Sequence, residues 1–197
     1  MNMSAVIVLA GGKSRRMGRD KLALETDGRT MLQSVVSRFQ KEFEQVYISV
    51  ADADKYPDVA AHRVVDIYPG AGPMSGLHAA LSSVPGAGVF LVAADLPYAG
   101  PECAKRIIDL CGDKDACMIR HTDMRLEPLF GYYRKTLLKR CEAALESGNF
   151  SMAELILGAD VRFLDPGELC GLWDEKMLMN VNYPEDYENF QKQARRP

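Results

Sequence analysis

The chain has 197 residues, of which 47% are hydrophobic and 26% charged, so it has the composition of a globular protein with a substantial core. Its net charge of −3 lacks the basic excess that binding to a nucleic-acid backbone requires. No apolar run approaches the roughly 20 residues of a membrane span, and the short run at 4–10 lacks the features of a signal peptide. We therefore expect a cytoplasmic protein that works on neither nucleic acid nor a membrane.

Strand and helix signals alternate through the N-terminal half. The apolar run at 4–10 predicts a strand buried on both faces of a parallel sheet. Thr30 predicts the N-cap of a helix that runs to about residue 41. Further strands are predicted at 46–50, 63–65 and 88–93, and further helices at 74–82 and 101–111.

The second half is less regular. Strands are predicted at 116–120, 127–133 and 161–164, and a helix at 135–147. Ser151 predicts the cap of a short helix, because Glu154 stands three residues further on. A last helix is predicted at 184–194. Since no linker separates these elements, we expect a single domain over 1–197.

This element order predicts an α/β fold with a mostly parallel sheet between two layers of helices. In such sheets, ligands bind outside the carboxyl ends of the strands. The loop at 11–21 and Asp95, which follows the strand at 88–93, are therefore the first candidates for chemistry.

The loop after the first strand combines glycines with cations. Its glycines allow the backbone to approach a ligand closely, and its amides can point at phosphate oxygens. The cationic side chains can neutralise the roughly four negative charges of a triphosphate. They are Lys13, Arg15, Arg16, Arg19 and Lys21. The loop is not a P-loop, because Ile7 stands where that motif needs glycine, and it is not the dinucleotide fingerprint GxGxxG.

Asp95 lies at the tip of a predicted buried strand, with Pro97 two residues later. Magnesium is usually held by one or two carboxylates together with substrate phosphates. Asp95 is therefore a candidate magnesium ligand. The three histidines, His62, His78 and His121, lack metal-ligand spacing, and the five cysteines contain no CxxC pair, so we expect structural histidines and no zinc site.

Six segments resemble one family. The segment LAGGKSRRMGRDK at 9–21 resembles the pattern LAGGxSxRMGxDK of the molybdenum cofactor guanylyltransferases, the MobA family. Further family motifs are resembled, in the same order, by DIYPGAGPMSGL at 66–77, DLPY at 95–98, LEPLFGYY at 126–133, GNFS at 148–151 and NVNYPED at 180–186. Tyr183 stands where the family usually has threonine. The resemblance covers nearly the whole chain and implies a three-layer, Rossmann-like nucleotidyltransferase fold.

The resemblance also implies roles for individual residues. GTP would be bound by Leu9, Ala10, Gly11, Gly12, Lys21, Asp66 and Asp95. Arg15, Lys21 and Asp95 would be catalytic, with Mg²⁺ on Asp95, and Asn180 and Asn182 would lie on the acceptor side. After the strand at 46–50 the family often has an asparagine. Here Ser49, Ala51 and Asp52 are found, so recognition of the base or ribose at that point stays open.

The implied reaction is transfer of GMP from GTP to the molybdopterin cofactor, with release of pyrophosphate and transient contact with proteins that deliver or receive the cofactor. One alternative is a cytidylyltransferase acting on molybdopterin or a small alcohol phosphate, although Gly11-Gly12 favours guanine. A second is a catalytically idle nucleotide-binding regulator, although Lys21 and Asp95 are both present. A third is a sugar-phosphate nucleotidyltransferase, whose chains are usually longer.

Overall fold

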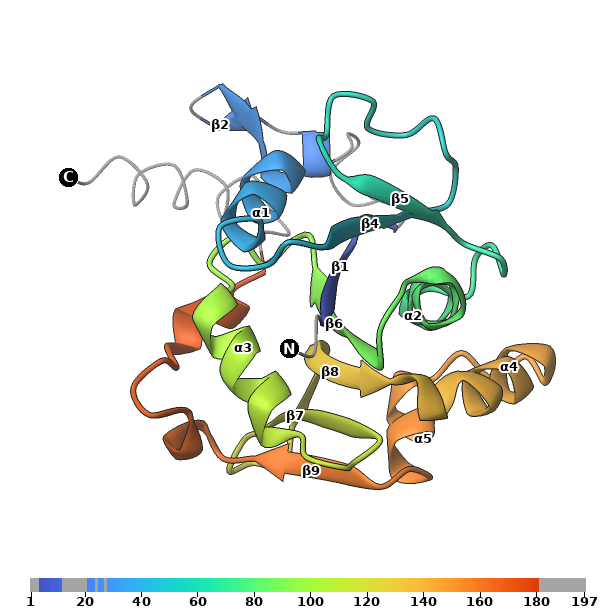
Figure 1. Ribbon diagram of the computed structural model, residues 1–197, viewed down its shortest axis with the longest axis vertical. Coiled ribbons are helices and arrows are strands. Elements are labelled where there is room, and N and C mark those ends of the chain that lie inside the picture. Colours follow the sequence, from blue (N-terminus) through green and yellow to red (C-terminus); the bar gives the residue numbers. More distant parts are fainter. Residues whose placement is uncertain (1–3, 12–20, 24, 27, 181–197) are drawn as a thin grey trace.

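The computed structural model describes residues 4–11, 21–23, 25–26 and 28–180 (Figure 1). Its centre is a seven-stranded sheet with the order β5-β4-β1-β6-β8-β7-β9. The strands are β1 (Ala5–Leu9), β4 (Val46–Val50), β5 (His62–Val65), β6 (Gly88–Ala93), β7 (Ala116–Arg120), β8 (Leu126–Arg134) and β9 (Val161–Leu164). Within this sheet β8 alone runs against the other six, so the predicted mostly parallel sheet is confirmed.

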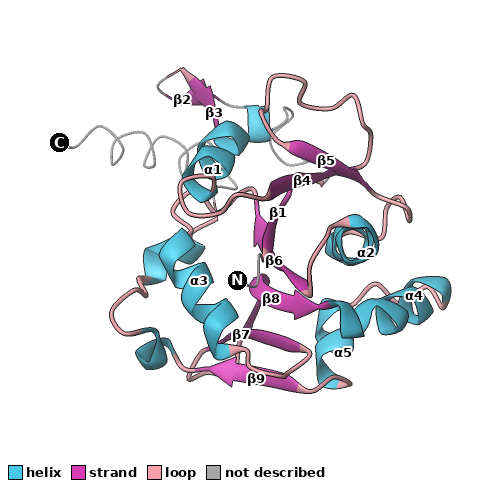
Figure 2. Cartoon of the chain, viewed as in Figure 1, coloured by secondary structure: helices cyan, strands magenta, loops and turns pink. Residues whose placement is uncertain are grey.

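Helices cover both faces of the sheet (Figures 1 and 2). On one face lie α1 (Met31–Phe39) and α3 (Pro101–Leu110), and on the other lie α2 (Pro73–Ser83), α4 (Leu138–Glu146) and α5 (Met152–Leu157). The result is the predicted three-layer α/β architecture.

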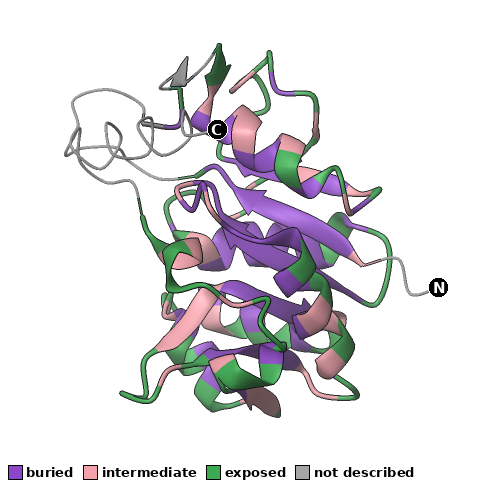
Figure 3. Cartoon of the chain, turned by 90° about the vertical axis from the view of Figure 1, so that its left-hand side faces the viewer, coloured by how far each residue is buried: buried purple, intermediate pink, exposed green. Residues whose placement is uncertain are grey.

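The core lies between the layers, and Figure 3 shows the buried residues concentrated in the sheet and on the inner faces of the helices. All side chains of β1 and β6 are buried, because both strands lie inside the sheet and both of their faces are covered. Their continuous apolar sequences, AVIVL and GVFLVA, fit this position. These two strands hold the centre of the sheet in place.

The first helix begins at the predicted residue. The Gln33 amide donates to the Thr30 hydroxyl at 3.2 Å, and the Thr30 amide donates to Gln33 Oε1 at 2.8 Å. This reciprocal capping box satisfies two amides that the helix leaves unpaired. The cap fixes where the chain enters α1, just after the N-terminal hairpin.

Several short elements were not predicted. They are the hairpin of β2 (Glu25–Thr26) and β3 (Arg29–Thr30), and the 3₁₀ helices η1 (Lys21–Ala23), η3 (Pro166–Leu169) and η4 (Glu175–Leu178). Elements of this length are too short to show a hydrophobic period. The helix predicted at 135–147 is present, but its first turn is the 3₁₀ helix η2 (Lys135–Leu137), which continues as α4. The helix predicted at 184–194 lies outside the described residues.

Candidate functional site

Four parallel strands end at one edge of the sheet. Backbone hydrogen bonds join the chain segments that follow these strands to one another. The Ala10 amide donates to the Ser49 carbonyl at 3.0 Å, and the Ala94 amide donates to the Leu9 carbonyl at 3.1 Å. The Asp66 amide donates to the Val50 carbonyl at 2.9 Å. The first strand and the strand that precedes Asp95 therefore end side by side, as predicted.

Asp66 is held beside the start of the glycine-rich loop. Its Oδ1 accepts a hydrogen bond from the Ser49 hydroxyl at 2.9 Å, and Ser49 is only 1% exposed. Its Oδ2 lies 3.8 Å from the point where a Cβ on Gly11 would stand. Burial raises the pKa of the Asp66 carboxyl, and the Ser49 hydrogen bond opposes that shift. The structure thus places a fixed, half-buried carboxyl over the end of β1.

Gly76 in α2 packs closely against the residues that hold Asp66 in place. A Cβ at Gly76 would come within 2.5 Å of Ser49 Oγ and 2.6 Å of Leu9 Cδ2. Only glycine allows α2 to approach β1 and β4 this closely. Sequence reasoning treated Gly76 as part of a packing motif and considered Ser49 for base or ribose recognition. The structure instead shows Ser49 inside β4 as a buried partner of Asp66.

Asp95 lies in the turn that follows β6, directly after Ala94, whose amide is bonded to the end of β1. It is partly buried. The β6 strand stands between β1 and β8 in the sheet. Asp95 therefore follows a strand near the middle of the sheet. The strands that lead to Asp66 lie on one side of it, and the hairpin of β7 and β8 lies on the other.

Several predicted site residues cannot be placed in full. Gly12, Arg15 and Asn182 lie outside the described residues. The backbone of Lys21 begins η1, but the position of its side chain lies outside the description. Leu9 and Ala10 are buried and Gly11 is exposed, so the described part of the loop emerges from the core at Gly11.

The segment after β9 returns to the loop that carries Asp95. A Cβ on Gly100 would come within 2.8 Å of Met177 Cε, so η4 lies directly against residue 100. Met177 and Leu178 pack against the core beneath α1 and α3. Asn180 follows η4 by two residues and is exposed. This packing ties the stretch that leads to Asn180 to the start of α3.

A cluster that sequence reasoning missed lies at the turn between β7 and β8. His121 Nε2 and Glu127 Oε1 are 2.7 Å apart, and Arg125 Nη1 donates to the same oxygen at 3.2 Å. The His121 ring also stands against Trp173, with 5.9 Å between the ring centroids. The sequence indicated only a structural role for His121. Glu127 lies in the family-like segment at 126–133, but His121 lies outside it, and no local sequence pattern predicts a contact across the turn.

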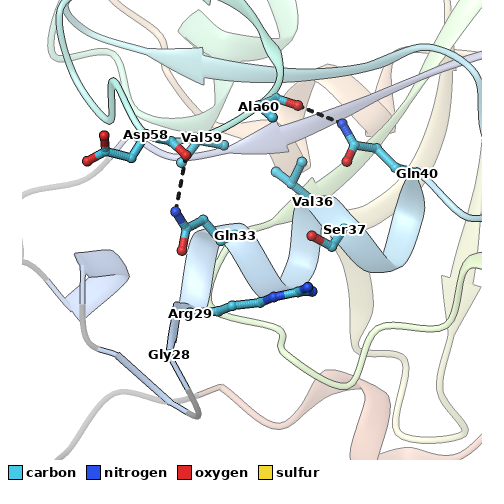
Figure 4. Close-up of a pocket in the computed structure, with 9 residues that line it drawn as sticks. All are labelled: Gly28, Arg29, Gln33, Val36, Ser37, Gln40, Asp58, Val59 and Ala60. Carbon is cyan, nitrogen blue, oxygen red and sulfur yellow. Dashed lines mark hydrogen bonds between the residues drawn. The ribbon is translucent and has the colours of Figure 1, made fainter.

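A separate hollow of about 350 Å³ lies beside α1 (Figure 4). Two glutamines of α1 reach across to the turn before β5, where Gln33 Nε2 donates to the Asp58 carbonyl at 3.1 Å and Gln40 Nε2 to the Ala60 carbonyl at 2.7 Å. None of the predicted site residues lines it; its walls are Gly28, Arg29, Gln33, Val36, Ser37, Gln40, Asp58, Val59 and Ala60. The candidate site is therefore the edge of the sheet and not this hollow.

The sequence and the fold were compared with known proteins. The family model described as "MobA-like NTP transferase domain" matches residues 6–162. The chain belongs to this family. It is 32% identical to a probable molybdenum cofactor guanylyltransferase of Pelotomaculum thermopropionicum, over 91% of this chain and 88% of that protein. It is 28% identical to the molybdenum cofactor guanylyltransferase of Campylobacter jejuni serotype O:6, over 99% of both.

Among solved structures, molybdopterin-guanine dinucleotide biosynthesis protein A of Archaeoglobus fulgidus superposes with a TM-score of 0.83, at 23% identity, over 96% of this chain and 98% of the other. At that identity the likeness shows the shared fold. Together the comparisons confirm the family resemblance and identify a transferase of the nucleotidyltransferase type, associated with molybdenum cofactor biosynthesis. None of the helices in the described residues has the length and apolar character that a membrane crossing requires.

Proposed function

We propose that this chain transfers GMP from GTP to the molybdopterin cofactor and releases pyrophosphate. The relatives named as molybdenum cofactor guanylyltransferases support this reaction. The observation that carries the donor half of the proposal is the Asp66 carboxyl, fixed by Ser49 beside Gly11. A carboxylate in that position suits N–H or O–H donors of a nucleoside whose phosphates run along the glycine-rich loop.

The roles that we propose for the loop follow from its charge. Lys21 and Arg15 bind the triphosphate and offset the negative charge that builds up as pyrophosphate leaves. The backbone from Leu9 to Gly12 contacts the nucleotide. The acceptor's phosphate is already largely ionised near neutral pH, so it attacks without a general base. Catalysis then depends on alignment of the two substrates rather than on a covalent intermediate.

Asp95 is the residue that we propose as the Mg²⁺ ligand. No group of three or more histidine, cysteine, aspartate or glutamate side chains within the described residues could hold a metal by itself. A single protein carboxylate such as that of Asp95 fits magnesium, which is commonly held by one or two carboxylates and completes its shell with substrate phosphates and water. When bound, the ion would neutralise charge on the phosphates. Asn180 and Asn182 are proposed to lie on the acceptor side.

The experiment that tests the donor half is calorimetric titration of GTP, ATP and CTP into the purified protein with Mg²⁺. We expect GTP to bind at least about tenfold more tightly than CTP, because a base-specific hydrogen-bonding site rejects a mismatched base. A preference for CTP would replace the proposal with the cytidylyltransferase alternative. Binding of GTP without turnover, when the acceptor is supplied, would favour the idle regulator.

A further inference from the structure

The cluster at the β7–β8 turn presents a carboxylate that is largely removed from water. The side chains of His121 and Glu127 are only 13% and 18% exposed. Both partners of Glu127, His121 and Arg125, contact the same oxygen, Oε1. Within the described residues, every contact of this carboxylate that the structure shows is made through Oε1, so Oε2 is the atom that can accept from a ligand. The turn itself is fixed, because the His121 amide donates to the Arg125 carbonyl at 2.9 Å.

Sheet order places this carboxylate on β8, the strand beside the one that leads to Asp95. The antiparallel pairing of β6 with β8 ends at Val92 opposite Phe130. The chain after β6 turns at residues 94–95, while β8 reaches past the end of this pairing to Leu126. The β7 strand runs in the same direction as β6, since both are antiparallel to β8, so His121 follows β7 at the carboxyl edge of the sheet. Glu127 and Asp66 therefore flank the Asp95 turn from opposite sides.

An aromatic side chain stands beside the carboxylate. Trp173 is partly buried, packs against the core beneath α3, and meets the His121 ring at an interplanar angle of 64°. It lies in the stretch just before η4, whose Met177 contacts Gly100 behind the Asp95 turn. A flat surface and a partly buried carboxylate thus share one side of the candidate site. The combination suits a planar heterocycle that carries N–H donors on one edge.

The chemistry points to a 2-amino-4-oxopyrimidine edge. Such an edge presents a ring N–H beside an exocyclic amino group, and Oε2 of Glu127 can accept a hydrogen bond from one of these two donors. Both guanine and a pterin carry it. Asp66 already occupies the side of the sheet on which the glycine-rich loop begins, so the Glu127 side is left for the second substrate. We infer that Glu127 and Trp173 form the subsite that binds the pterin ring of the acceptor, with His121 and Arg125 as positioning residues.

This inference rests on the proposed function, in which the acceptor is a pterin. Its test uses the only tryptophan of the chain, Trp173, as a local probe. Pterins absorb light in the range where tryptophan emits, so a pterin bound against Trp173 quenches its emission. The probe is 6-hydroxymethylpterin, titrated into the intact protein, with free tryptophan amide as the correction for absorbance. We expect saturable quenching.

The matched variants are Glu127→Gln and Glu168→Gln. Glu168 pairs with Arg162 at 3.3 Å on the surface, so its substitution removes a glutamate ion pair away from the cluster. Glu127→Gln is expected to weaken pterin binding by about tenfold or more, because a hydrogen bond to a charged oxygen is lost. Glu168→Gln should bind pterin like the parent protein, and GTP affinity measured by calorimetry should be unchanged in both.

Other results would overturn the inference. Equal pterin binding by the parent and Glu127→Gln would remove Glu127 from the subsite, and loss of GTP affinity with unchanged pterin binding would make this a guanine pocket. If the parent protein binds pterin but no GTP, the donor assignment fails and the pterin subsite stands. If Glu127→Gln does not fold, pterin binding to Trp173→Phe and Trp173→Leu is measured by calorimetry. Binding that is retained in Trp173→Phe and lost in Trp173→Leu supports stacking of the pterin ring on Trp173. Binding that is retained in both variants contradicts it.

Discussion

Gly76 and Ser49 approach each other so closely that a Cβ on Gly76 would stand 2.5 Å from the Ser49 hydroxyl oxygen. Ser49 in turn donates to Asp66, so the helix, the strand and the candidate nucleoside ligand form one connected unit. Gly76→Ala should therefore destabilise the protein by about 1–3 kcal/mol, although alanine is the better helix former, because the added methyl overpacks a buried contact. It should also weaken GTP binding. Urea unfolding and calorimetry measure the two effects.

The matched control for this prediction is the double variant Ser49→Ala with Gly76→Ala. Removal of the hydroxyl relieves the closest contact, so the two substitutions together should cost less stability than the sum of each alone. Strict additivity of the two unfolding free energies would mean that the contact is not what makes Gly76 necessary.

Asp66→Asn should separate binding from stability. Because burial raises the pKa of Asp66, its ionised form carries a cost in the folded state. That cost is absent below the unfolded pKa of about 3.9 and is complete above the folded pKa. The carboxamide oxygen of the variant can still accept the hydrogen bond from Ser49. The variant should therefore be more stable than the parent at pH 7, and the difference should shrink as the pH falls toward about 4.

The same substitution should lower GTP affinity by about tenfold to a hundredfold, because hydrogen bonds to a charged group are replaced by weaker ones. Urea titrations at several pH values and calorimetry at pH 7 give both quantities. A variant that binds GTP as the parent does would remove Asp66 from the nucleoside site.

Asp95→Ala should abolish magnesium-dependent turnover while the protein stays folded. Loss of the residue that fixes a charge-stabilising group typically costs about a hundredfold or more in rate. Thermal unfolding checks the fold, and pyrophosphate release measured over a magnesium titration checks the role. Asp109→Ala, an exposed aspartate in α3, is the control. A folded and fully active Asp95→Ala protein would contradict the role of Asp95 as the Mg²⁺ ligand.

Gly100→Ala should disturb the acceptor side through Met177. The new methyl would meet Met177 Cε at 2.8 Å, and since methionine is flexible the cost to stability should be only about 1 kcal/mol. The displacement should nevertheless reach Trp173 and shift its emission. Adding Met177→Ala should restore the emission of the parent protein. An unchanged emission spectrum in Gly100→Ala would show that η4 is not held by this contact.

The fold was largely predictable because its strands are continuous apolar runs bounded by turns. The strands at 46–50, 88–93, 116–120 and 161–164 were predicted with the boundaries that the structure has. The hairpin of β2 and β3 was missed because each strand has only two residues. The single-domain organisation stays a prediction.

The site was predictable only in part. Asp66 and Asp95 stand in family motifs, so sequence alone proposed them. The hydrogen bond between Ser49 and Asp66 joins a residue of β4 to the residue that follows β5, 17 positions further along the chain, and no local pattern predicts such a contact. No local pattern predicts the contact of Met177 with Gly100 or that of Trp173 with His121 either. The catalytic and binding roles of all these residues remain proposals.

The most direct test of the central claim is product analysis after incubation of the protein with Mg²⁺, Mo-molybdopterin and either GTP or CTP. The account predicts equimolar pyrophosphate and a guanine dinucleotide form of the cofactor with GTP, and at least about tenfold less product with CTP. Formation of the cytosine dinucleotide in preference, or no dinucleotide from either nucleotide with a folded protein, would contradict it.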